Sequence, residues 1–229
     1  MAASVHRLMT TRKEPGRTLA RAHFHHGQLR EALIHNALQA IAQRGVEGFS
    51  LREAAQQAGV SPSAAYRHFE DKAALLAEIA RQAFAALADA MEHAMAQAVG
   101  GRRTAAARAK AAFVAQGLAY MRFALAEPTR YRVMFGPYGA GSGHDVSGRS
   151  AAGATPYELL MRATGDVLGP GATASEQHSA AVFAWATVHG LADLLISRSL
   201  SHPGDAATEA LMTQTVGRVH ASVVARNRA

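Results

Sequence analysis

The feature that most constrains this chain is a close succession of helix starts around one tight turn. Ser50-Leu51-Arg52-Glu53 has the spacing of a capping box, in which the Ser hydroxyl and the Glu carboxylate pair with free N–H groups. Gly59 tolerates the positive φ of a tight turn. Ser61-Pro62 then restarts a helix, because Ser caps well and Pro suits the first helical position. The spacing therefore predicts two short helices joined by a turn, with Asp71 capping a longer helix behind them.

Helical patterns continue on both sides of this segment, and no alternating strand pattern or fixed-period repeat interrupts them. Apolar residues at helical spacing predict a first helix over about 27–44, ending at Gly45. The third helix is expected to end around Phe69. Breaks rich in Gly and Pro then delimit helices over about 71–99, 104–126, 128–135, 155–168, 173–200 and 205–224. The chain is therefore expected to be all-α, with about nine helices.

Composition narrows the function classes. Lys and Arg number 24 against 17 Asp and Glu, and the excess gathers before Glu31, which permits an anionic partner. The absence of Cys excludes disulfides, thiolate metal sites and Cys nucleophiles. No apolar run near the N-terminus could serve as a signal peptide, and the longest one, residues 180–196, is interpreted as a buried helix. We expect a cytoplasmic protein with no membrane partner.

A helix, a Gly-containing turn and a second helix are the parts of a helix-turn-helix, although this spacing alone also fits a plain helical hairpin. Residues 49–79, FSLREAAQQAGVSPSAAYRHFEDKAALLAEI, resemble the TetR family of bacterial transcriptional regulators over many fixed positions. The resemblance extends over roughly residues 24–80. It implies an all-α homodimer whose N-terminal domain binds a palindromic DNA operator and whose C-terminal domain binds a small effector and dimerises. The expected division is a flexible basic arm (1–24), a helix-turn-helix domain (25–72) and an effector-binding and dimerisation domain (73–229).

The resemblance also implies which residues contact DNA. Hydroxyls and a small methyl group at the tip of the second helix suit base edges, and the aromatic and basic side chains further along suit phosphates. The expected contacts are Ser50, Leu51, Arg52, Ser61, Pro62, Ser63, Ala64, Tyr66, Arg67, His68 and Lys72. Many family members carry a polar residue where this chain has Ala64, so direct base readout is expected to be thin.

The C-terminal half resembles one TetR subgroup, named for a Trp-His-Gly signature, in residues 127–137 and 184–195. Large apolar side chains there could line a cavity, or each could be ordinary core. The expected effector contacts are Phe113, Tyr120, Phe123, Met134, Tyr157, Met161, Trp185 and His189. The last two long helices are the expected dimer face, where Gly190 and Ala192 would allow close approach.

Other residue patterns bear on rival functions. The Gly-rich stretch 139–144 completes neither a dinucleotide-binding nor a nucleophile-elbow motif, so we expect no enzyme activity and no cofactor. His23, His25 and His26 could chelate a metal, but phosphate contact explains a basic arm better, and no metal site is expected. A non-specific polyanion-binding protein remains the main alternative to a ligand-responsive repressor that releases DNA when a largely apolar effector binds.

Overall fold

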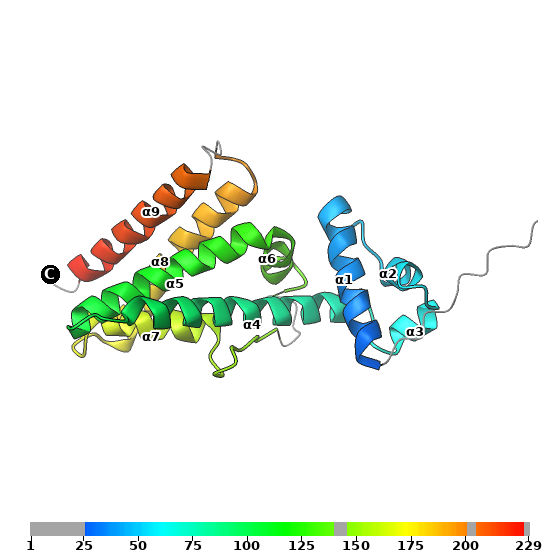
Figure 1. The fold of residues 1–229 in the computed structure, drawn as a ribbon, viewed down its shortest axis with the longest axis horizontal. Helices are drawn as coiled ribbons and strands as arrows, with labels where there is room; N and C mark the ends of the chain where they lie inside the picture. The colour runs from blue at the N-terminus through cyan, green and yellow to red at the C-terminus, as the bar shows by residue number, and fades with distance from the viewer. Residues whose placement is uncertain (1–25, 140–145, 201–204, 227–229) are drawn as a thin grey trace, which may run out of the picture.

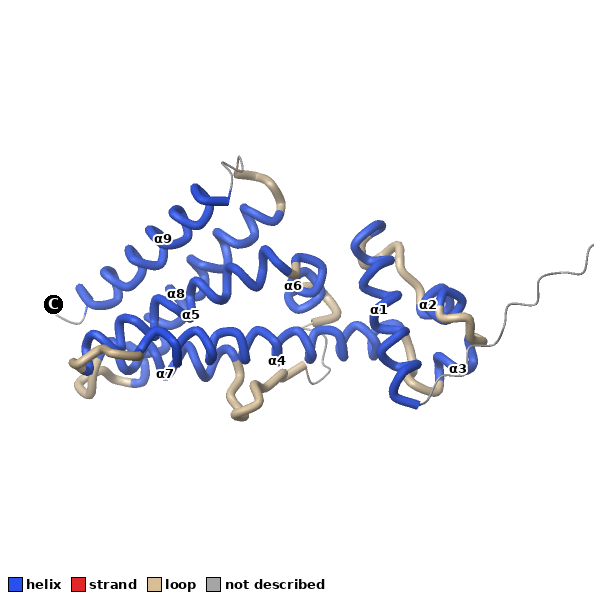
Figure 2. The backbone as a smooth tube through the Cα atoms, in the orientation of Figure 1, coloured by secondary structure: helices blue, strands red, loops and turns tan. Residues whose placement is uncertain are grey.

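The computed structural model describes residues 26–139, 146–200 and 205–226, and every regular element in these ranges is an α-helix (Figure 1, Figure 2). The nine helices within them are α1 (His26–Arg44), α2 (Leu51–Gln57), α3 (Pro62–Tyr66), α4 (Lys72–Val99), α5 (Ala105–Ala126), α6 (Pro128–Phe135), α7 (Pro156–Leu168), α8 (Ala174–Ile196) and α9 (Asp205–Arg226). The expected all-α fold with about nine helices is confirmed. The basic arm expected over residues 1–24 and the histidines within it lie outside the described residues.

Local signals shape the turn between α2 and α3. The Ser50 hydroxyl accepts a hydrogen bond from the N–H of Glu53 at 3.2 Å, as expected of an N-cap. Only half of the predicted capping box forms, because the Glu53 carboxylate accepts from Arg44 at 2.6 Å instead. Gly59 adopts the positive φ, +70°, that the tight turn requires. The third helix ends at Tyr66, three residues earlier than expected.

One apolar core holds α1, α2 and α3 against the start of α4. Its larger members are Leu29, Leu33, Ile34, Ile41, Phe49, Leu51, Phe69, Leu75, Leu76 and Ile79. Two residues from much later in the chain, Val133 of α6 and Val146, are buried in the same core. The N-terminal helices are therefore packed against elements of the C-terminal half.

The long helix α4 is shared between two cores. Its first turns bury Leu76 and Ile79 in the N-terminal core, and later turns bury Leu87 and Met91 in a second core with α5, α6, α8 and α9. At 1.5 Å per residue, its 28 residues span roughly 42 Å. Figure 1 shows it running from the α1–α3 end towards the far end of the molecule. The expected domain boundary at residue 72 thus falls at the first residue of a continuous helix.

The C-terminal half is built around α5, which packs along α4 and also contacts α7, α8 and α9. Complete capping boxes start α7 at Thr155 and α8 at Thr173, each with the Glu three residues on returning to the cap N–H. The expected helix to about residue 200 ends earlier, at Ile196, and Arg198 beyond it has a positive φ of +57°.

The expectation that residues 180–196 form a buried helix is only half right. Ala184, Val188 and Ala192 face the core, but Val182, Phe183 and Leu194 are 41%, 40% and 44% exposed on the other side. Ala192 is therefore buried within its own chain and is not available for a dimer contact, contrary to expectation. Among the described helices α8 is long and apolar enough to cross a membrane, and 33% of that stretch is buried. Length and composition alone cannot separate a membrane span from a helix that packs against another protein surface.

Candidate functional site

The predicted DNA contacts lie at the α2–α3 end of the molecule, opposite the C-terminus (Figure 1). Seven of the eleven are exposed: Ser50, Arg52, Ser61, Pro62, Ser63, Tyr66 and Arg67. The Tyr66 ring is 52% exposed, so the core gains little from it. Such an aromatic ring with a polar tip is suited to contact a partner surface.

Leu51 and Ala64 are placed differently from expectation. Their exposed fractions are 3% and 8%, and both side chains belong to the N-terminal core. Ala64 is covered because the short helix α3 packs against α1 and α2 through Ala64 and Ala65, and Leu51 is the first residue of α2, buried in the same core. The Ala64 methyl therefore does not stand at the surface where a base could meet it.

The polar tip of α3 is partly satisfied within the protein. The Ser61 hydroxyl accepts from the N–H of Ala64 at 3.3 Å, and the Ser61 and Ser63 hydroxyl oxygens lie 2.9 Å apart in a hydrogen bond. One hydroxyl proton is therefore committed to the other hydroxyl, which leaves the pair fewer groups for base edges. The tip of α3 therefore offers few polar groups for direct contact with base edges.

Cationic side chains flank this tip. Among the described residues, no acid lies within ion-pair distance of Arg52 or Arg67. Lys72 is half-buried, with its Nζ 3.9 Å from a Glu47 carboxylate oxygen and 5.7 Å from the Tyr138 ring centroid. Arg52 and Arg67 are thus the cations best able to neutralise phosphates, while Lys72 is held against its own protein.

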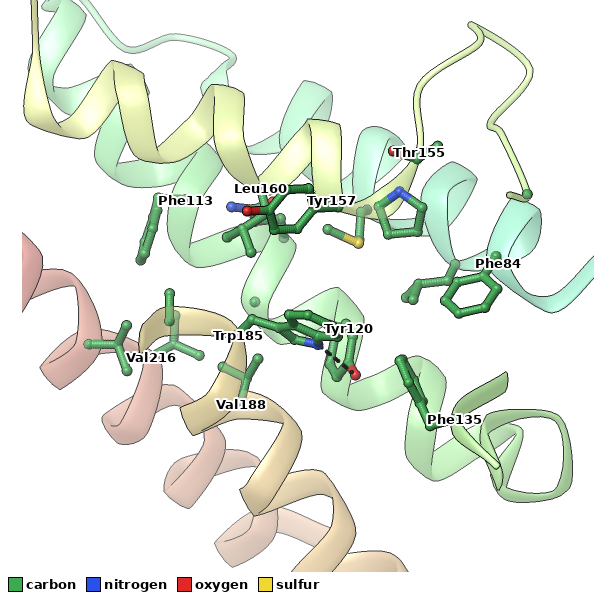
Figure 3. Close-up of a pocket in the computed structure, with 18 of the residues that line it drawn as sticks. Phe84, Phe113, Tyr120, Phe135, Thr155, Tyr157, Leu160, Trp185, Val188 and Val216 are labelled. Carbon is green, nitrogen blue, oxygen red and sulfur yellow. Dashed lines mark hydrogen bonds between the residues drawn. The ribbon is translucent and has the colours of Figure 1, made fainter. Parts of the chain in front are cut away.

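The C-terminal half contains an apolar cavity of about 360 Å³, within the size range of small-molecule pockets (Figure 3). Side chains from α4 to α9 line it, together with residues 146–148. Its lining is Phe84, Leu87, Met91, Phe113, Gln116, Gly117, Tyr120, Phe135, Val146, Ser147, Gly148, Thr155, Pro156, Tyr157, Leu160, Ala184, Trp185, Val188, Val216 and Val219. None of these described residues carries a formal charge.

The cavity brings together half of the predicted effector contacts. Phe113, Tyr120, Tyr157 and Trp185 line it, and Figure 3 shows them around one space. Phe123, Met134, Met161 and His189 are not among the lining residues; Met134 is buried in the second core, against which Phe123 also packs.

Sequence reasoning did not select Gln116 or Phe84. Gln116 follows Phe113 by three residues and precedes Tyr120 by four, so it lies on the same helix face, and that spacing was the available signal. Phe84 lies on α4, in the part of the C-terminal half nearest the N-terminal core. No sequence pattern around it predicts that it lines the cavity.

Beside the cavity, His189 completes a partly buried polar network. Its Nδ1 lies 2.7 Å from the Tyr120 hydroxyl and 2.8 Å from the Tyr131 hydroxyl, and Tyr120 donates to Tyr131 at 3.3 Å. The Trp185 indole N–H donates to the Tyr120 oxygen at 3.4 Å. These groups are all satisfied when His189 is neutral, with Nδ1 as acceptor and its proton on Nε2.

Burial sets the protonation of this network. Desolvation lowers the pKa of His189 below 6.5, opposed by the Asp193 carboxylate, whose oxygen lies 4.0 Å from Nε2. Burial also raises the pKa of Tyr120 to about 12 and raises the pKa of Tyr131. The neutral forms that satisfy these hydrogen bonds are therefore the forms that burial favours.

The cavity wall and the N-terminal core share residues. Val146 lines the cavity and is also buried in the N-terminal core, and Phe84 lines the cavity and packs against both cores. Gly148 lies so close to α4 that an added Cβ would strike the backbone at Arg81 and Ala85. The cavity wall is therefore in direct packing contact with the core that holds α1, α2 and α3.

Comparison with known proteins agrees with this geometry. Residues 33–79 match the family described as "Bacterial regulatory proteins, tetR family", and residues 113–219 match "Tetracyclin repressor-like, C-terminal domain". Together the two matches cover about two thirds of the chain. No curated protein sequence matches the chain significantly.

Solved structures show the same fold. A protein of unknown function from Rhodococcus sp. RHA1 is 30% identical, with a TM-score of 0.66, covering 88% of this chain and 96% of its own. A tetR-family regulatory protein from Rhodococcus RHA1 is 18% identical, with a TM-score of 0.59, covering 86% and 97%. A TetR family transcription regulator from Marinobacter aquaeolei VT8 is 16% identical, with a TM-score of 0.50, covering 83% and 94%.

The helix-turn-helix, its exposed cationic face and the second helical domain define a DNA-binding protein. Both matched segments are characteristic of one family. The chain belongs to the TetR family of bacterial transcriptional regulators, which is not a family of enzymes.

Proposed function

We propose that this regulator is a repressor that binds a palindromic operator as a homodimer and is released by a small, largely apolar effector. The observation that carries the proposal is the shared wall between the cavity and the N-terminal core, formed by Phe84 and Val146. A ligand shifts a conformational equilibrium only by its differential affinity for the two states. A wall common to both regions supplies that difference, because filling one side changes the packing of the other.

The DNA-binding half of the proposal rests on exposure and charge. Tyr66 and Arg67 lie in solvent at one end of the molecule, and Arg52 of α2 is also exposed, without a described acidic partner. Phosphate contacts of this kind position a protein but carry little sequence information. Since the tip of α3 offers few free polar groups, part of the operator preference would come from DNA shape.

The dimer half rests on α8 and α9. Val182, Phe183 and Leu194 form an exposed apolar face on α8, and an added Cβ at Gly190 or Gly217 would meet nothing within 4 Å of its own chain. A second copy covering this face would bury those side chains and give a DNA reader two equivalent half-site contacts. The apolar character of α8 is then that of an interface helix.

A regulator of DNA works in the cytoplasm, which is the location we propose.

We also propose that the protein belongs to the TetR subgroup that is named for a Trp-His-Gly signature. Trp185, His189 and Gly190 carry the Trp-His-Gly signature, and the first two cluster with Tyr120 and Tyr131 beside the cavity. This clustering supports a common role in shaping the effector site.

The operator test uses DNA upstream of the protein's own gene against a random duplex of equal length, at matched salt. We expect the upstream DNA to bind at least a hundredfold more tightly, as specific sites commonly do, with an affinity that falls steeply with salt. Equal affinities would overturn the proposal and favour the non-specific polyanion binder.

Sedimentation of the free protein and of a Phe183→Asp variant tests the dimer, since a charge in a buried apolar interface should release monomers.

The metal-binding alternative gains no support from the described residues, where no group of three or more His, Asp or Glu side chains could hold a metal ion. His23 and His25 fall outside them, and His26 is the first residue of α1. Metal titration of the full-length protein, followed by operator binding with and without a chelator, tests that alternative separately.

A further inference from the structure

Gln116 is an unusual member of the cavity lining. It sits in the middle of α5 and is 2% exposed. Neither its amide nitrogen nor its amide oxygen has a hydrogen-bond partner among the described residues, and both atoms are covered. An amide buried without partners costs free energy, so a fold keeps one only where something else offsets that cost.

The other polar groups near the cavity are already committed. Tyr120 and Trp185 are joined to each other and to the His189 network, and the Thr155 hydroxyl caps α7. Gln116 lies on the helix face between Phe113 and Tyr120, so it is the polar group of the lining with both a donor and an acceptor unused. The terminal torsion of a Gln side chain is broad, which lets the amide turn from the wall into the cavity.

The lining also limits the charge of a ligand. No described lining residue is charged, and a carboxylate or ammonium brought into such a lining would lose its hydration without gaining a counter-ion. Six aromatic rings surround the space: Phe84, Phe113, Tyr120, Phe135, Tyr157 and Trp185. Rings of this kind favour a flat partner that can lie against a face or an edge.

We propose that the cavity takes an uncharged, ring-bearing ligand with a carboxamide or lactam group that pairs at two points with the Gln116 amide. The inference rests on the proposed function in identifying this cavity as the effector site. An amide-type group offers an acceptor beside a donor, which is the complement of a Gln side chain. A purely apolar ligand of the same shape leaves Gln116 unpaired, and a carboxylate adds a buried charge.

Three probes of one shape test this: 2-naphthamide, 2-methylnaphthalene and 2-naphthoate, titrated calorimetrically into the full-length protein without DNA. In the wild type we expect 2-naphthamide to bind about tenfold more tightly than 2-methylnaphthalene and 2-naphthoate to bind most weakly. The Gln116→Met variant, of equal length and apolar, should lose the advantage of the amide and keep its affinity for 2-methylnaphthalene. Gln177→Met, a change on α8 outside the lining, is the matched control and should keep the wild-type order.

A stability measurement separates a recognition role from a structural one. Because Gln116→Met removes an unpaired buried amide, its melting temperature should be equal to or a few degrees above that of the wild type. A drop of several degrees would show that the amide holds the fold together and would overturn the inference. So would a wild-type protein that binds the amide and methyl probes equally, and this comparison needs no variant.

Operator release by the same probes distinguishes this inference from the proposed function. If 2-naphthamide binds preferentially but leaves operator affinity unchanged, the ligand class stands and the proposed release mechanism fails. If all three probes release the operator with equal potency and Gln116→Met changes nothing, release stands and the ligand class fails.

Discussion

The two halves of this regulator are both helical, but they differ in where they place their aromatic and apolar side chains. The N-terminal half packs short helices through Ala, Leu and Phe side chains and keeps Tyr66 and its cations in solvent. The C-terminal half places six aromatic rings around a cavity and leaves an apolar face of α8, which includes Phe183, in solvent. The ring of Tyr66 therefore lies in solvent at the face expected to contact DNA, whereas the ring of Tyr131 is buried in the second core, beside the cavity. Two tyrosines, Tyr131 and Tyr66, make the contrast testable with the same substitution.

The largest effect is expected at Tyr131, which is 2% exposed and hydrogen-bonded to His189. Tyr131→Ala should lower the free energy of unfolding by about 3–5 kcal/mol, because it opens a cavity in the second core. Denaturant unfolding followed by the fluorescence of Trp185, the one tryptophan of the sequence, measures this change. Tyr131→Phe is the control and should cost only about 1–2 kcal/mol, since it removes one hydroxyl. A loss below about 1 kcal/mol for Tyr131→Ala would contradict the role of Tyr131 in the second core.

A smaller loss is expected where residues 146–148 cross α4. A Cβ on Gly148 would strike the backbone at Arg81 and Ala85, neither of which can turn aside like a side chain. Gly148→Ala should therefore destabilise the protein by about 1–3 kcal/mol and weaken binding of a cavity probe. Gly100→Ala is the matched control, with its nearest contact an ordinary 3.6 Å and a φ of −55° that Ala accepts. Equal effects of the two substitutions would show that this crossing is not under steric constraint.

Tyr66→Ala should reverse the pattern of Tyr131→Ala. Because the ring is 52% exposed, its loss should change the free energy of unfolding by no more than about 0.5 kcal/mol. As a phosphate contact, it should weaken operator binding roughly tenfold, uniformly across operator variants. Fluorescence anisotropy on wild-type and mutated operator DNA measures both features. A clear fall in melting temperature would instead assign Tyr66 to the core.

The predictable part of the molecule is the part whose signals are local. The caps at Ser50 and Ser61 and the turn at Gly59 act within four residues of themselves, so the sequence predicted the two short helices and their connection. The burial of Ala64 was not predicted, because exposure on so short a helix depends on how α1 and α2 pack around it.

The cavity is the less predictable part. Its wall joins α4 to residues 146–148 and to α8, segments far apart in the sequence. Helical periodicity identifies which face of α5 is inward, but it cannot tell a filled core from a space between helices. Phe123 and Phe113 have the same side chain, and only Phe113 lines the cavity.

The smallest predicted effect is a loss of stability on acidification. It should reach the C-terminal half first and the N-terminal half only at lower pH. Burial lowers the pKa of His189 in the folded protein below 6.5, so on acidification the unfolded chain takes up this proton first. Stability is therefore lost as pH falls below about 6.5, and the loss is complete below the folded pKa. In the N-terminal half, burial alone would raise the pKa of Glu78, but hydrogen bonds from Arg81 and Arg30 outweigh it and lower the pKa to about 2. The stability this carboxylate contributes is present above pH 4.5 and is lost only as pH falls towards 2.

The C-terminal half should therefore lose stability as pH falls below about 6.5, while the Glu78 carboxylate still holds α4 to α1 through Arg30. Trp185 fluorescence reports the first half, and hydrogen exchange at the buried amides of α1 reports the second. In His189→Asn, whose amide oxygen can occupy the place of Nδ1 as a non-titrating acceptor, the loss of stability between pH 7 and 5.5 should be smaller than in the wild type. Burial also lowers the pKa of His220, so a residual slope of the same sign should persist in this variant. If His189→Asn keeps the full slope, or if exchange in α1 rises before the fluorescence changes, the two halves do not differ in the way their buried groups predict.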